Sequence, residues 1–557
     1  MKIIIIGGYG VFGGRLVELL FDVVDLEIVV SGRNLSKAEV FCQGFNGQST
    51  IRALYVDRNN IDETLRSECP DIVIDASGPF QSYGSNHYCV IKSCIKQKVH
   101  YLDFADAAAF VFGVSKFDEE AKVAGVFVLS GVSSFPVLTA AVLRNMAKTM
   151  DIVKVQGGIA PSVFAGVGMN VMRAVLSYAG EPVTLQRNGE ISHGIGLAES
   201  MRYTIAVPGK LPLNNIRFSL VDVPDLQVIP PEHPTLTDIW MGAGPVPEVL
   251  HRMLNFLSKT RAFLKLPSLV PFSRLFYTVL NSVKIGEHRG GMYVHAQGTS
   301  EGEIIEQSWH LLAEGDDGPY IPSMTIESII RKMLQGQQPK SGARSGANAL
   351  ELSDYDKLFK NKNIYTGFRK EENTSLLFRQ VLGSAFDTLP EEIQKMHSEL
   401  KASHWSGSAN VKRGKGVLVK VICRFFGFPK AENNVSVEVS ITPDSNGERW
   451  VRNFGSNKFS SFLKRGKHKN EFLIVERFGV LDFGVALVIE GGELFYVIRR
   501  WSCFGLPLPS FLLPKGRSFE SQKNGLFCFN IEIFVPMIGL IVSYKGNLKR
   551  TKVEVSQ

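Results

Sequence analysis

The sequence has few cysteines, and none of them forms a recognisable pattern. The seven cysteines are odd in number, scattered and never spaced as C-x-x-C, which indicates neither a disulfide framework nor a zinc site. No apolar run reaches the roughly 18 residues that a membrane-spanning helix needs. GxSxG, HExxH and Walker motifs are also missing, so a hydrolase, a zinc protease and a P-loop enzyme lack support.

A secretory signal is also missing from the start of the sequence. The first apolar strand begins at Ile3, directly after Met1, and the first domain needs that strand. We therefore expect a cytoplasmic location. The chain has 557 residues, which suggests about three domains. Its 45% hydrophobic and 21% charged residues are typical of a globular protein with large cores.

The most informative feature is the opening MKIIIIGGYGVFGGRL. Ile3 to Ile6 predicts a buried parallel strand that leads into the pattern Gly8-x-Gly10-x-x-Gly13 and then an amphipathic helix. In a dinucleotide site the first glycine permits the turn, the second lets a pyrophosphate approach, and the third lets helix pack on strand. The alternative is a glycine-rich turn in another kind of α/β domain.

The end of the second strand indicates which nicotinamide cofactor would bind. The strand covers Leu26 to Val30 and is followed by Ser31-Gly32-Arg33-Asn34. An NAD site usually has Asp or Glu here to bond the ribose 2′-hydroxyl, and this sequence has none. The guanidinium of Arg33 offers donors to a 2′-phosphate, which favours NADP. The alternative is that Arg33 is a solvated turn residue.

Further strands alternate with helices through the first part of the chain. This alternation predicts a doubly wound parallel sheet, a Rossmann fold, with ligand at the carboxyl ends of the strands. Asp57 ends a short strand and could bond the adenine amino group or cap the next helix. The other predicted strands are 71–75, 99–103 and 126–129, and the predicted helices lie around 61–68, 86–96 and 117–123.

Five strings of this region carry a resemblance: GGYGVFGGRL, SGR, DASGPF with Gly84 after it, HYLDFAD and GVSSFP. They resemble a known family, the saccharopine dehydrogenase and reductase-like oxidoreductases. The resemblance covers roughly residues 1–350 and is strongest in the first 140. It implies an NADP-binding Rossmann domain over 1–130 and an α+β domain over 131–355 that binds substrate and often mediates dimerisation. It also implies hydride transfer to or from a C=N or related bond of a small molecule.

The resemblance carries over cofactor positions but no catalytic motif. It places Gly8, Gly10, Phe12 and Gly13 at the pyrophosphate, Arg33 at the 2′-phosphate, and Ser77, Gly78 and Pro79 near the nicotinamide. From the sequence, the candidate proton donors are Tyr101 and Asp103 at the carboxyl end of a strand, with His100 behind them. Each of the three could instead be a structural residue at a strand end. No metal ligand set is expected.

The middle segment mixes helices and strands. Residues 163–178 predict a helix of small residues, suited to close packing in a core or at a dimer seam. Residues 266–280 form an apolar centre that could dip into a membrane interface, although a buried core or a pocket wall is favoured. His288 and Arg289 could meet a substrate carboxylate or belong to a structural hairpin.

The pattern changes after an exposed linker at 356–384. Strings such as ERWVRNFG and GLPLP resemble a bacterial domain of unknown function, DUF4166, which implies no activity. Residues 385–550 predict a mostly antiparallel domain, a curved sheet or barrel, that folds separately and holds an apolar molecule or has a solid core. The predicted strands are 417–426, 435–441, 449–454, 471–478, 481–489, 493–499, 526–534 and 538–544.

Nearly all of the net charge of +8 lies after about residue 381. The clusters at 412–415 and 464–469 could attract an anionic surface, but solubilising hairpin tips are favoured. No nucleic-acid motif is present, so no nucleic-acid partner is expected. We expect an NADP-dependent oxidoreductase with a small-molecule substrate, for which an apolar compound is one option. The alternative is a non-catalytic nucleotide-binding sensor or scaffold with a ligand-binding β domain.

Overall fold

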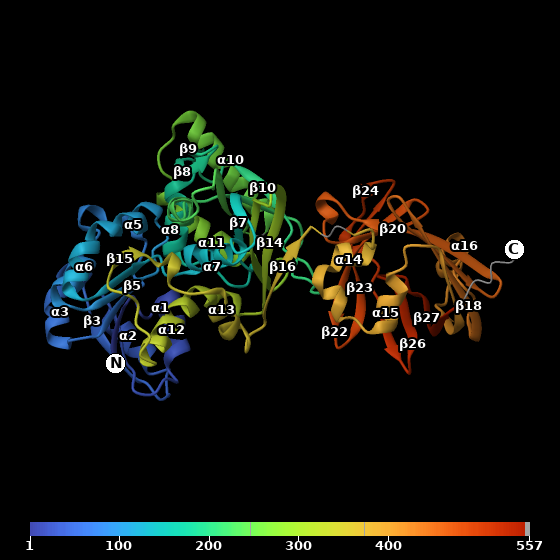
Figure 1. The fold of residues 1–557 in the computed structure, drawn as a ribbon, viewed down its shortest axis with the longest axis horizontal. Helices are drawn as coiled ribbons and strands as arrows, with labels where there is room; N and C mark the ends of the chain where they lie inside the picture. Colours follow the sequence, from blue (N-terminus) through green and yellow to red (C-terminus); the bar gives the residue numbers. More distant parts are fainter. Residues whose placement is uncertain (246, 372–373, 552–557) are drawn as a thin grey trace. The chain divides into compact units, whose positions relative to one another are not determined.

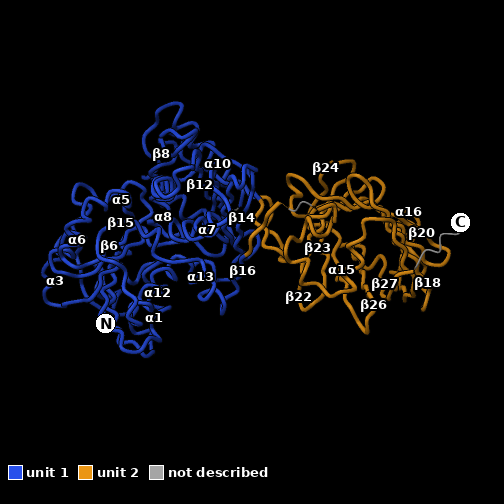
Figure 2. The backbone as a smooth tube through the Cα atoms, in the orientation of Figure 1, with its two compact units in different colours: residues 1–203, 216–366 blue, residues 204–215, 367–557 orange. Residues whose placement is uncertain are grey.

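The structure is a computed structural model that describes residues 1–245, 247–371 and 374–551. Contacts divide the chain into two compact units (Figure 2). Unit 1 comprises residues 1–203 and 216–366, and unit 2 comprises residues 204–215 and 367–557. Within the described ranges, no helix is both long and apolar enough to cross a membrane.

Unit 1 begins with a seven-stranded parallel sheet of order β15-β6-β5-β4-β1-β2-β3. This order confirms the predicted doubly wound Rossmann domain. Its strands are β1 (Lys2–Ile6), β2 (Glu27–Gly32), β3 (Thr50–Tyr55), β4 (Ile72–Asp75), β5 (His100–Asp103), β6 (Phe127–Ser130) and β15 (Gly342–Ser345). The helices that alternate with them are α1 (Val11–Leu20), α2 (Leu35–Cys42), α3 (Ile61–Glu68), α4 (Cys89–Gln97), α5 (Ala108–Phe112) and α6 (Asp118–Ala124), seen in Figure 1.

The isoleucine run lies at the centre of this sheet. Ile3, Ile4 and Ile5 are fully buried, because β1 is flanked by β2 on one side and β4 on the other. The strand order reverses between β1 and β4, and ligands bind at such a reversal in open α/β sheets. The strand β15 joins the sheet beside β6 from far along the sequence, which local patterns did not predict.

The second sheet of unit 1 is mixed, with order β10-β11-β12-β7-β13-β14-β16. It confirms the predicted α+β middle segment. Its strands are β7 (Asp151–Ala160), β10 (Ser200–Tyr203), β11 (Ile216–Leu220), β12 (Asp238–Ala243), β13 (Arg289–Ser300), β14 (Glu303–Glu314) and β16 (Ile364–Lys370), with a separate hairpin of β8 (Pro182–Arg187) and β9 (Glu190–Ile195). The helices of this part are α7 (Thr139–Met146), α8 (Met169–Tyr178), α9 (Asp225–Val228), α10 (Glu248–Leu264), α11 (Ser273–Ser282), α12 (Ile321–Leu334) and α13 (Leu352–Phe359).

One prediction for the middle segment is wrong. Residues 266–280 were expected in a buried core or pocket wall, but Phe272, Leu275 and Val279 are exposed. Helix α11 buries only part of its apolar surface, where Phe276 and Leu280 pack against a small core. The predicted apolar run is real, yet only one of its faces has protein to pack against.

Unit 2 contains a closed antiparallel barrel of ten strands. The order is β22-β21-β20-β19-β18-β17-β27-β26-β25-β23, and pairing of β22 with β23 closes it. Of the two predicted alternatives, a curved sheet and a barrel, the barrel is confirmed. The strands are β17 (Ser403–Arg413), β18 (Glu432–Asp444), β19 (Gly447–Phe454), β20 (Asn457–Arg465), β21 (Ile474–Phe478), β22 (Leu481–Glu490), β23 (Glu493–Cys503), β25 (Ser518–Lys523), β26 (Leu526–Val535) and β27 (Gly539–Arg550), with β24 (Leu506–Pro507) appended to β23.

Two sequence assignments in this part are corrected by the structure. Residues 417–426 were predicted as a strand but form helix α16 (Val417–Phe426), whose buried Val419 and Cys423 are four residues apart, as on one helix face. The predicted linker 356–384 contains β16 and helix α14 (Leu377–Leu382). Leu377 and Phe378 belong to the apolar core of the barrel, as does Met396 of α15 (Glu391–His397).

Candidate functional site

The glycine turn after β1 forms the centre of the candidate cofactor site. Gly7 has φ +78°, and the amide of Gly8 donates to the carbonyl of Ser31 at 3.1 Å. A Cβ on Gly7 would lie 2.8 Å from the carbonyl oxygen of Ala76, so this turn touches the loop that follows β4. The tight turn therefore brings the first and fourth strand ends together at the reversal of strand order.

The next two glycines, Gly13 and Gly10, differ in the space around them. A Cβ on Gly13 would lie 2.5 Å from the carbonyl oxygen of Gly7, so only glycine lets α1 pack this closely on the turn. A Cβ on Gly10 would meet only that same carbonyl, at 3.0 Å, so the space beyond Gly10 is open. Gly10 caps α1 without a side chain, which leaves the first amides of the helix to a phosphate.

Tyr9, inside the glycine motif, is a residue that the sequence analysis missed. Its ring lies against Gly32, where a Cβ would come within 2.6 Å of the phenol oxygen. Its hydroxyl accepts a hydrogen bond from the amide of Asn34 at 3.2 Å. Arg33 stands between these two residues with an exposed side chain. The Tyr9 ring therefore explains why residue 32 of the SGR string is a glycine. The sequence shows both residues, but only the structure shows that they are in contact.

The loop after β4 is held by a polar network. The Ser77 hydroxyl donates to Asp75 at 2.6 Å and lies 2.7 Å from the hydroxyl of Tyr83. The guanidinium of Arg58 stacks 3.3 Å from the centre of the Tyr83 ring. Burial raises the pKa of Asp75, although the bonds from Ser77 act in the opposite direction. The network fixes the segment that contains Gly78 and Pro79.

Two contacts place this loop and Phe12. The side-chain amide of Asn170, at the start of α8, donates to the carbonyl of Gly78 at 2.9 Å. Phe12 stacks on Phe104 with ring centroids 5.6 Å apart, so it orders the segment after β5.

The carboxylate of Asp57 accepts from the amide of Asn59 at 3.0 Å and so acts as a cap, the second of its two predicted roles.

The predicted proton donors are buried within the sheet. Asp103 accepts hydrogen bonds from Ser130 at 2.8 Å and from the amides of Gly131 and Ala105. Burial raises its pKa to about 7. Tyr101 is also fully buried, and burial raises its pKa well above the ordinary value. Through these hydrogen bonds Asp103 stabilises the loops at the carboxyl ends of β5 and β6.

His100 is the first residue of β5, so it lies at the amino ends of the parallel strands, whereas the glycine turn lies at their carboxyl ends. Its ring stacks on Phe127 at 4.2 Å, and its Nδ1 accepts from the amide of Phe127. Burial lowers its pKa. The geometry therefore separates His100 from the glycine turn and from the loop after β4.

A polar group beside the loop after β4 was not predicted. Asp106 follows β5 and accepts a hydrogen bond from Gln81 at 3.1 Å. Asp222 follows β11, and burial together with the charge of Asp106 raises its pKa to about 6. Burial, with the charges of both carboxyl groups, raises the pKa of Tyr178 well above its ordinary value. Tyr178 of α8, Asp106 after a strand of the first sheet and Asp222 after a strand of the second sheet therefore lie close enough to interact.

The strand ends therefore gather two groups of residues in unit 1. The glycine turn, Arg33 and the loop after β4 suit a dinucleotide, and Asp106, Asp222 and Tyr178 suit a polar substrate group. Within the parts of the chain that the structure describes, no three His, Cys, Asp or Glu side chains are arranged to hold a metal ion. His288 bonds Asp316 at 2.9 Å, and Arg289 pairs with Glu287, so both take part in the hairpin.

Two family models match the sequence. Residues 3–129 match the saccharopine dehydrogenase NADP binding domain, and residues 389–548 match the domain of unknown function DUF4166. A search of curated protein sequences finds no match. The recognised resemblances are thus confirmed, and the chain is an oxidoreductase whose N-terminal domain binds a nicotinamide cofactor.

Several solved structures are similar in fold. Saccharopine dehydrogenase (L-Glu forming) from Saccharomyces cerevisiae has 12% identity and a TM-score of 0.46, covering 66% of this chain and 99% of that one. Amine dehydrogenase from Mycobacterium smegmatis has 11% identity and a TM-score of 0.32, covering 62% of this chain and 94% of that one. At these values neither structure identifies a substrate for this chain.

Proposed function

We propose that this oxidoreductase uses NADPH to reduce a C=N bond in a small molecule. The observation that carries the choice of NADPH is the end of β2, where the exposed Arg33 stands and residues 31–34 contain no carboxylate. A guanidinium can bond a 2′-phosphate, whereas a carboxylate would repel it. The family model of the first 129 residues supports the same cofactor.

The chain would hold the cofactor at three places. The amides at the start of α1 would bond the pyrophosphate, and Gly10 leaves room for it. Arg33 would bond the 2′-phosphate, with the Tyr9 ring beside it. The loop of Ser77, Gly78 and Pro79 would support the nicotinamide half. When bound, the cofactor supplies a hydride, and the protein contributes position and electrostatics.

Reduction of a C=N bond adds a hydride to carbon and a proton to nitrogen. The proton must come from a group whose pKa is close to the working pH, as for any general acid. Burial and the charge of Asp106 raise the pKa of Asp222 to about 6, so this carboxyl is half protonated near pH 6, where an ordinary Asp is ionised. We assign Asp222 as the group that protonates the imine nitrogen, while Asp106, held by Gln81, attracts the positive charge that the nitrogen gains with this proton, before the hydride reaches the carbon.

The test is NADPH oxidation, followed by absorbance, with imines formed from ketones or aldehydes and amines. We expect turnover with at least one imine, and a rate that falls as pH rises above about 6, where a proton donor of this pKa is lost. Asp222→Asn should lower the rate roughly 100-fold or more. The matched surface variant Glu119→Gln, whose side chain is 85% exposed, should leave it unchanged.

Tight NADPH binding without turnover of any imine would contradict the reductase proposal and favour the nucleotide-binding sensor. Turnover that is equally fast with Asp222→Asn would leave the reductase standing and reject the assigned proton donor.

A further inference from the structure

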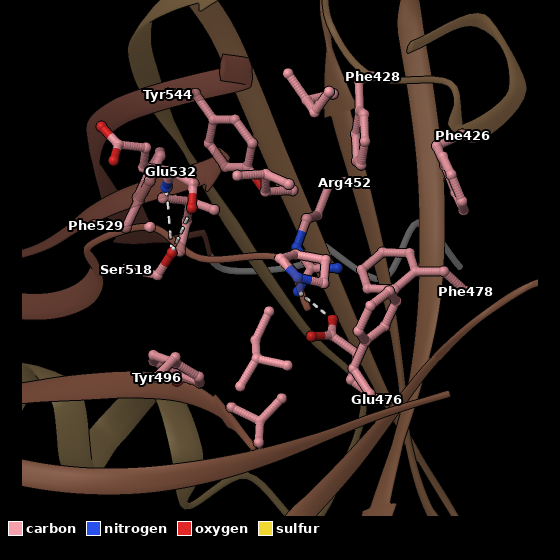
Figure 3. A pocket seen from close by; sticks show the side chains of 18 of the residues that line it. Phe426, Phe428, Arg452, Glu476, Phe478, Tyr496, Ser518, Phe529, Glu532 and Tyr544 are labelled. Atoms are coloured by element: carbon pink, nitrogen blue, oxygen red, sulfur yellow. Dashed lines mark hydrogen bonds and ion pairs between the residues drawn. The ribbon is translucent and has the colours of Figure 1, made fainter. Parts of the chain in front are cut away.

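The barrel of unit 2 encloses a cavity of about 610 Å³. This volume lies within the range of small-molecule sites, roughly 300–1,000 Å³. Figure 3 shows aromatic side chains around it, among them Phe426, Phe428, Phe478 and Phe529. The lining includes Lys515 and Gly516, which are exposed, so the cavity reaches the surface before β25.

The interior of the barrel is lined with apolar side chains but not filled by them. Alternate residues of β26 face inward, yet Phe529, Ile531 and Ile533 are only half-buried. In a solid core such side chains would be fully buried, as Leu494 and Val542 are in the same barrel. An apolar ligand would cover this surface, and burial of apolar area is favourable.

The polar side chains of the lining include Ser518, Glu520 and Glu532, as well as the ion pair of Arg452 and Glu476. Arg452 from β19 lies 3.4 Å from Glu476 on β21, and Ser461 on β20 donates to Glu476 at 2.7 Å and accepts from Arg452 at 2.9 Å. Figure 3 shows the pair at the cavity. The two charges cancel, so the pair offers a donor and an acceptor without net charge. Such a pair suits an uncharged head with a hydroxyl or carbonyl group and disfavours a carboxylate next to Glu476.

Helix α16 closes part of the cavity. Its Ile422 and Phe426 line the cavity, while Val419 and Cys423 pack into the barrel core. Phe378 of α14 also lines the space, and strands supply most of its remaining, largely apolar wall.

We propose that the barrel binds a single uncharged amphiphile, a long hydrocarbon chain with a hydroxyl, ester or carbonyl head at Arg452 and Glu476. The hydrocarbon covers the half-buried side chains of β26 and the neighbouring strands. The head accepts from the guanidinium of Arg452, and a hydroxyl head also donates to the carboxylate of Glu476. This site is independent of the nicotinamide site in unit 1.

The test uses the full chain and the uncharged dye Nile red, with 1-monooleoylglycerol and oleate as competitors. We expect one dye molecule per chain, displaced by 1-monooleoylglycerol at least 10-fold more strongly than by oleate at pH 8. Absence of dye binding by the parent protein would overturn the proposal. Stronger displacement by oleate would overturn the assignment of an uncharged head.

Variants locate the ligand. Ile531→Trp fills the cavity from β26 and should weaken binding at least 10-fold, whereas Phe534→Trp, on the outer side of the same strand, should not. The double variant Arg452→Leu, Glu476→Leu should keep dye binding but lose the preference for 1-monooleoylglycerol over oleate. Unchanged binding in Ile531→Trp, at unchanged melting temperature, would place the ligand elsewhere and overturn the proposal.

A second, independent observation concerns helices α10 and α11 of unit 1. Residues 249–286 contain no Asp or Glu. Arg261 is buried and pairs with Glu181. The remaining cations of the segment are exposed: Arg252, Lys259, Lys265, Arg274 and Lys284.

The same segment exposes large apolar side chains. Phe263 is 85% exposed and Leu275 is 61% exposed, and Phe256, Leu266 and Phe272 are also exposed. The opposite side of the hairpin is packed, since Leu254, Phe276 and Leu280 contact the core around α8. A helical element with one buried face, exposed aromatic residues and an excess of cationic side chains is typical of helices that lie in a membrane interface.

We infer that the α10–α11 hairpin docks on a bilayer with anionic lipids. The exposed phenylalanines enter the interface, and Lys259, Lys265, Arg274 and Lys284 meet the headgroups, while Arg252 pairs with Glu248 at the start of α10. A second copy of the chain is a poorer occupant. In a two-fold dimer the patch would face itself and bring like charges together.

The test is sedimentation of the full chain with vesicles of phosphatidylcholine, alone or with about 30 mol% phosphatidylglycerol. We expect binding at least 10-fold stronger with the anionic lipid and weakened by high salt, because salt screens the attraction. Phe263→Glu with Leu275→Glu should lower binding at least 10-fold. Val123→Glu, at an 89% exposed apolar residue of α6, is the matched control and should not.

Two results would overturn this inference. The first is vesicle binding that does not depend on the charge of the lipid or on the hairpin variants. The second is absence of vesicle binding together with a dimer in solution that Phe263→Glu converts to a monomer, which would assign the patch to a second copy.

Discussion

The first sheet of unit 1 and the barrel of unit 2 are both rich in apolar residues, but they leave space for a ligand in different positions. In the parallel sheet, Ile3 to Ile5 are fully buried, and helices alternate with the strands. In the barrel, Ile531 and Ile533 stay half-buried around a cavity of about 610 Å³. The sheet therefore has room for a ligand at its strand ends, and the barrel has room inside.

The difference follows from closure. An open sheet needs helices to cover it, and these fill both faces, so the polar groups that bind ligands collect where strands turn into loops. A barrel of ten strands covers its own edges and has a wide interior, which its side chains need not fill. The same apolar composition thus gives a packed core in one unit and a lined cavity in the other.

The largest expected effect comes from truncating one isoleucine in each unit. Ile4→Ala should destabilise unit 1 by about 2–5 kcal/mol, because it creates a cavity in a fully packed core. Ile533→Ala should cost about 1 kcal/mol or less, because its side chain already faces open space. Hydrogen exchange of peptides from β1 and β26, followed by mass spectrometry, measures each unit separately. Equal losses would show that the barrel interior is filled.

A second variant separates the two sites. Gly10→Val should abolish NADPH binding, at least 100-fold or about 2.7 kcal/mol, without unfolding the chain. The added side chain would occupy the open space at the start of α1, where it meets little of the protein itself. Calorimetry with NADPH measures the loss, and Nile red binding should stay at the parent level. Unchanged NADPH affinity in the folded variant would mean that the glycine turn is not the cofactor site.

Arg33→Ala sharpens the description of the strand-end site. We expect it to weaken NADPH binding by about 1–3 kcal/mol, the range for a charge-assisted hydrogen bond, and to leave NADH binding nearly unchanged. Titration of both cofactors by fluorescence gives the two affinities. Equal affinities for NADPH and NADH in the parent protein would contradict the role given to Arg33.

The smallest expected effect is the pH dependence of the stability of unit 1. Burial raises the pKa of Asp103 to about 7, above the ordinary value of about 3.9 in the unfolded chain. The folded state then binds this proton more tightly, so its contribution is fully present below about pH 4 and is lost as pH rises through about 7. Melting temperatures at pH 5 and pH 8 should differ less in Asp103→Asn than in the parent. Glu119→Gln should keep the parent difference.

Much of unit 1 could be predicted from local sequence. Ile3 to Ile6 and the spacing of Gly8, Gly10 and Gly13 predict a strand, a turn and a helix, because each requirement is met by adjacent residues. The candidate substrate groups could not be predicted in this way. Asp106, Asp222 and Tyr178 are far apart in the sequence and meet only because two sheets and α8 pack together.

The errors in the sequence analysis have a common cause. Residues 417–426 are rich in valine and phenylalanine, which favour strands, but the segment folds as a helix whose Val419 and Cys423 fit the barrel core. Residues 266–280 are apolar enough for a core, yet their position on the outside of α8 leaves one face exposed. Composition shows how much apolar surface a segment has, but tertiary packing determines whether other residues cover that surface.

The sequence by itself determined the order of strands and helices in the first domain, the cofactor turn, the cationic end of β2 and the change to antiparallel strands after residue 385. These follow from properties of neighbouring residues, such as periodicity, glycine spacing and charge. Only the tertiary structure decided that the barrel closes around a cavity, that Asp103 is a fastener of loops, and that α10 and α11 expose a cationic apolar face. Each of these depends on distances between residues far apart in the chain, which local sequence does not specify.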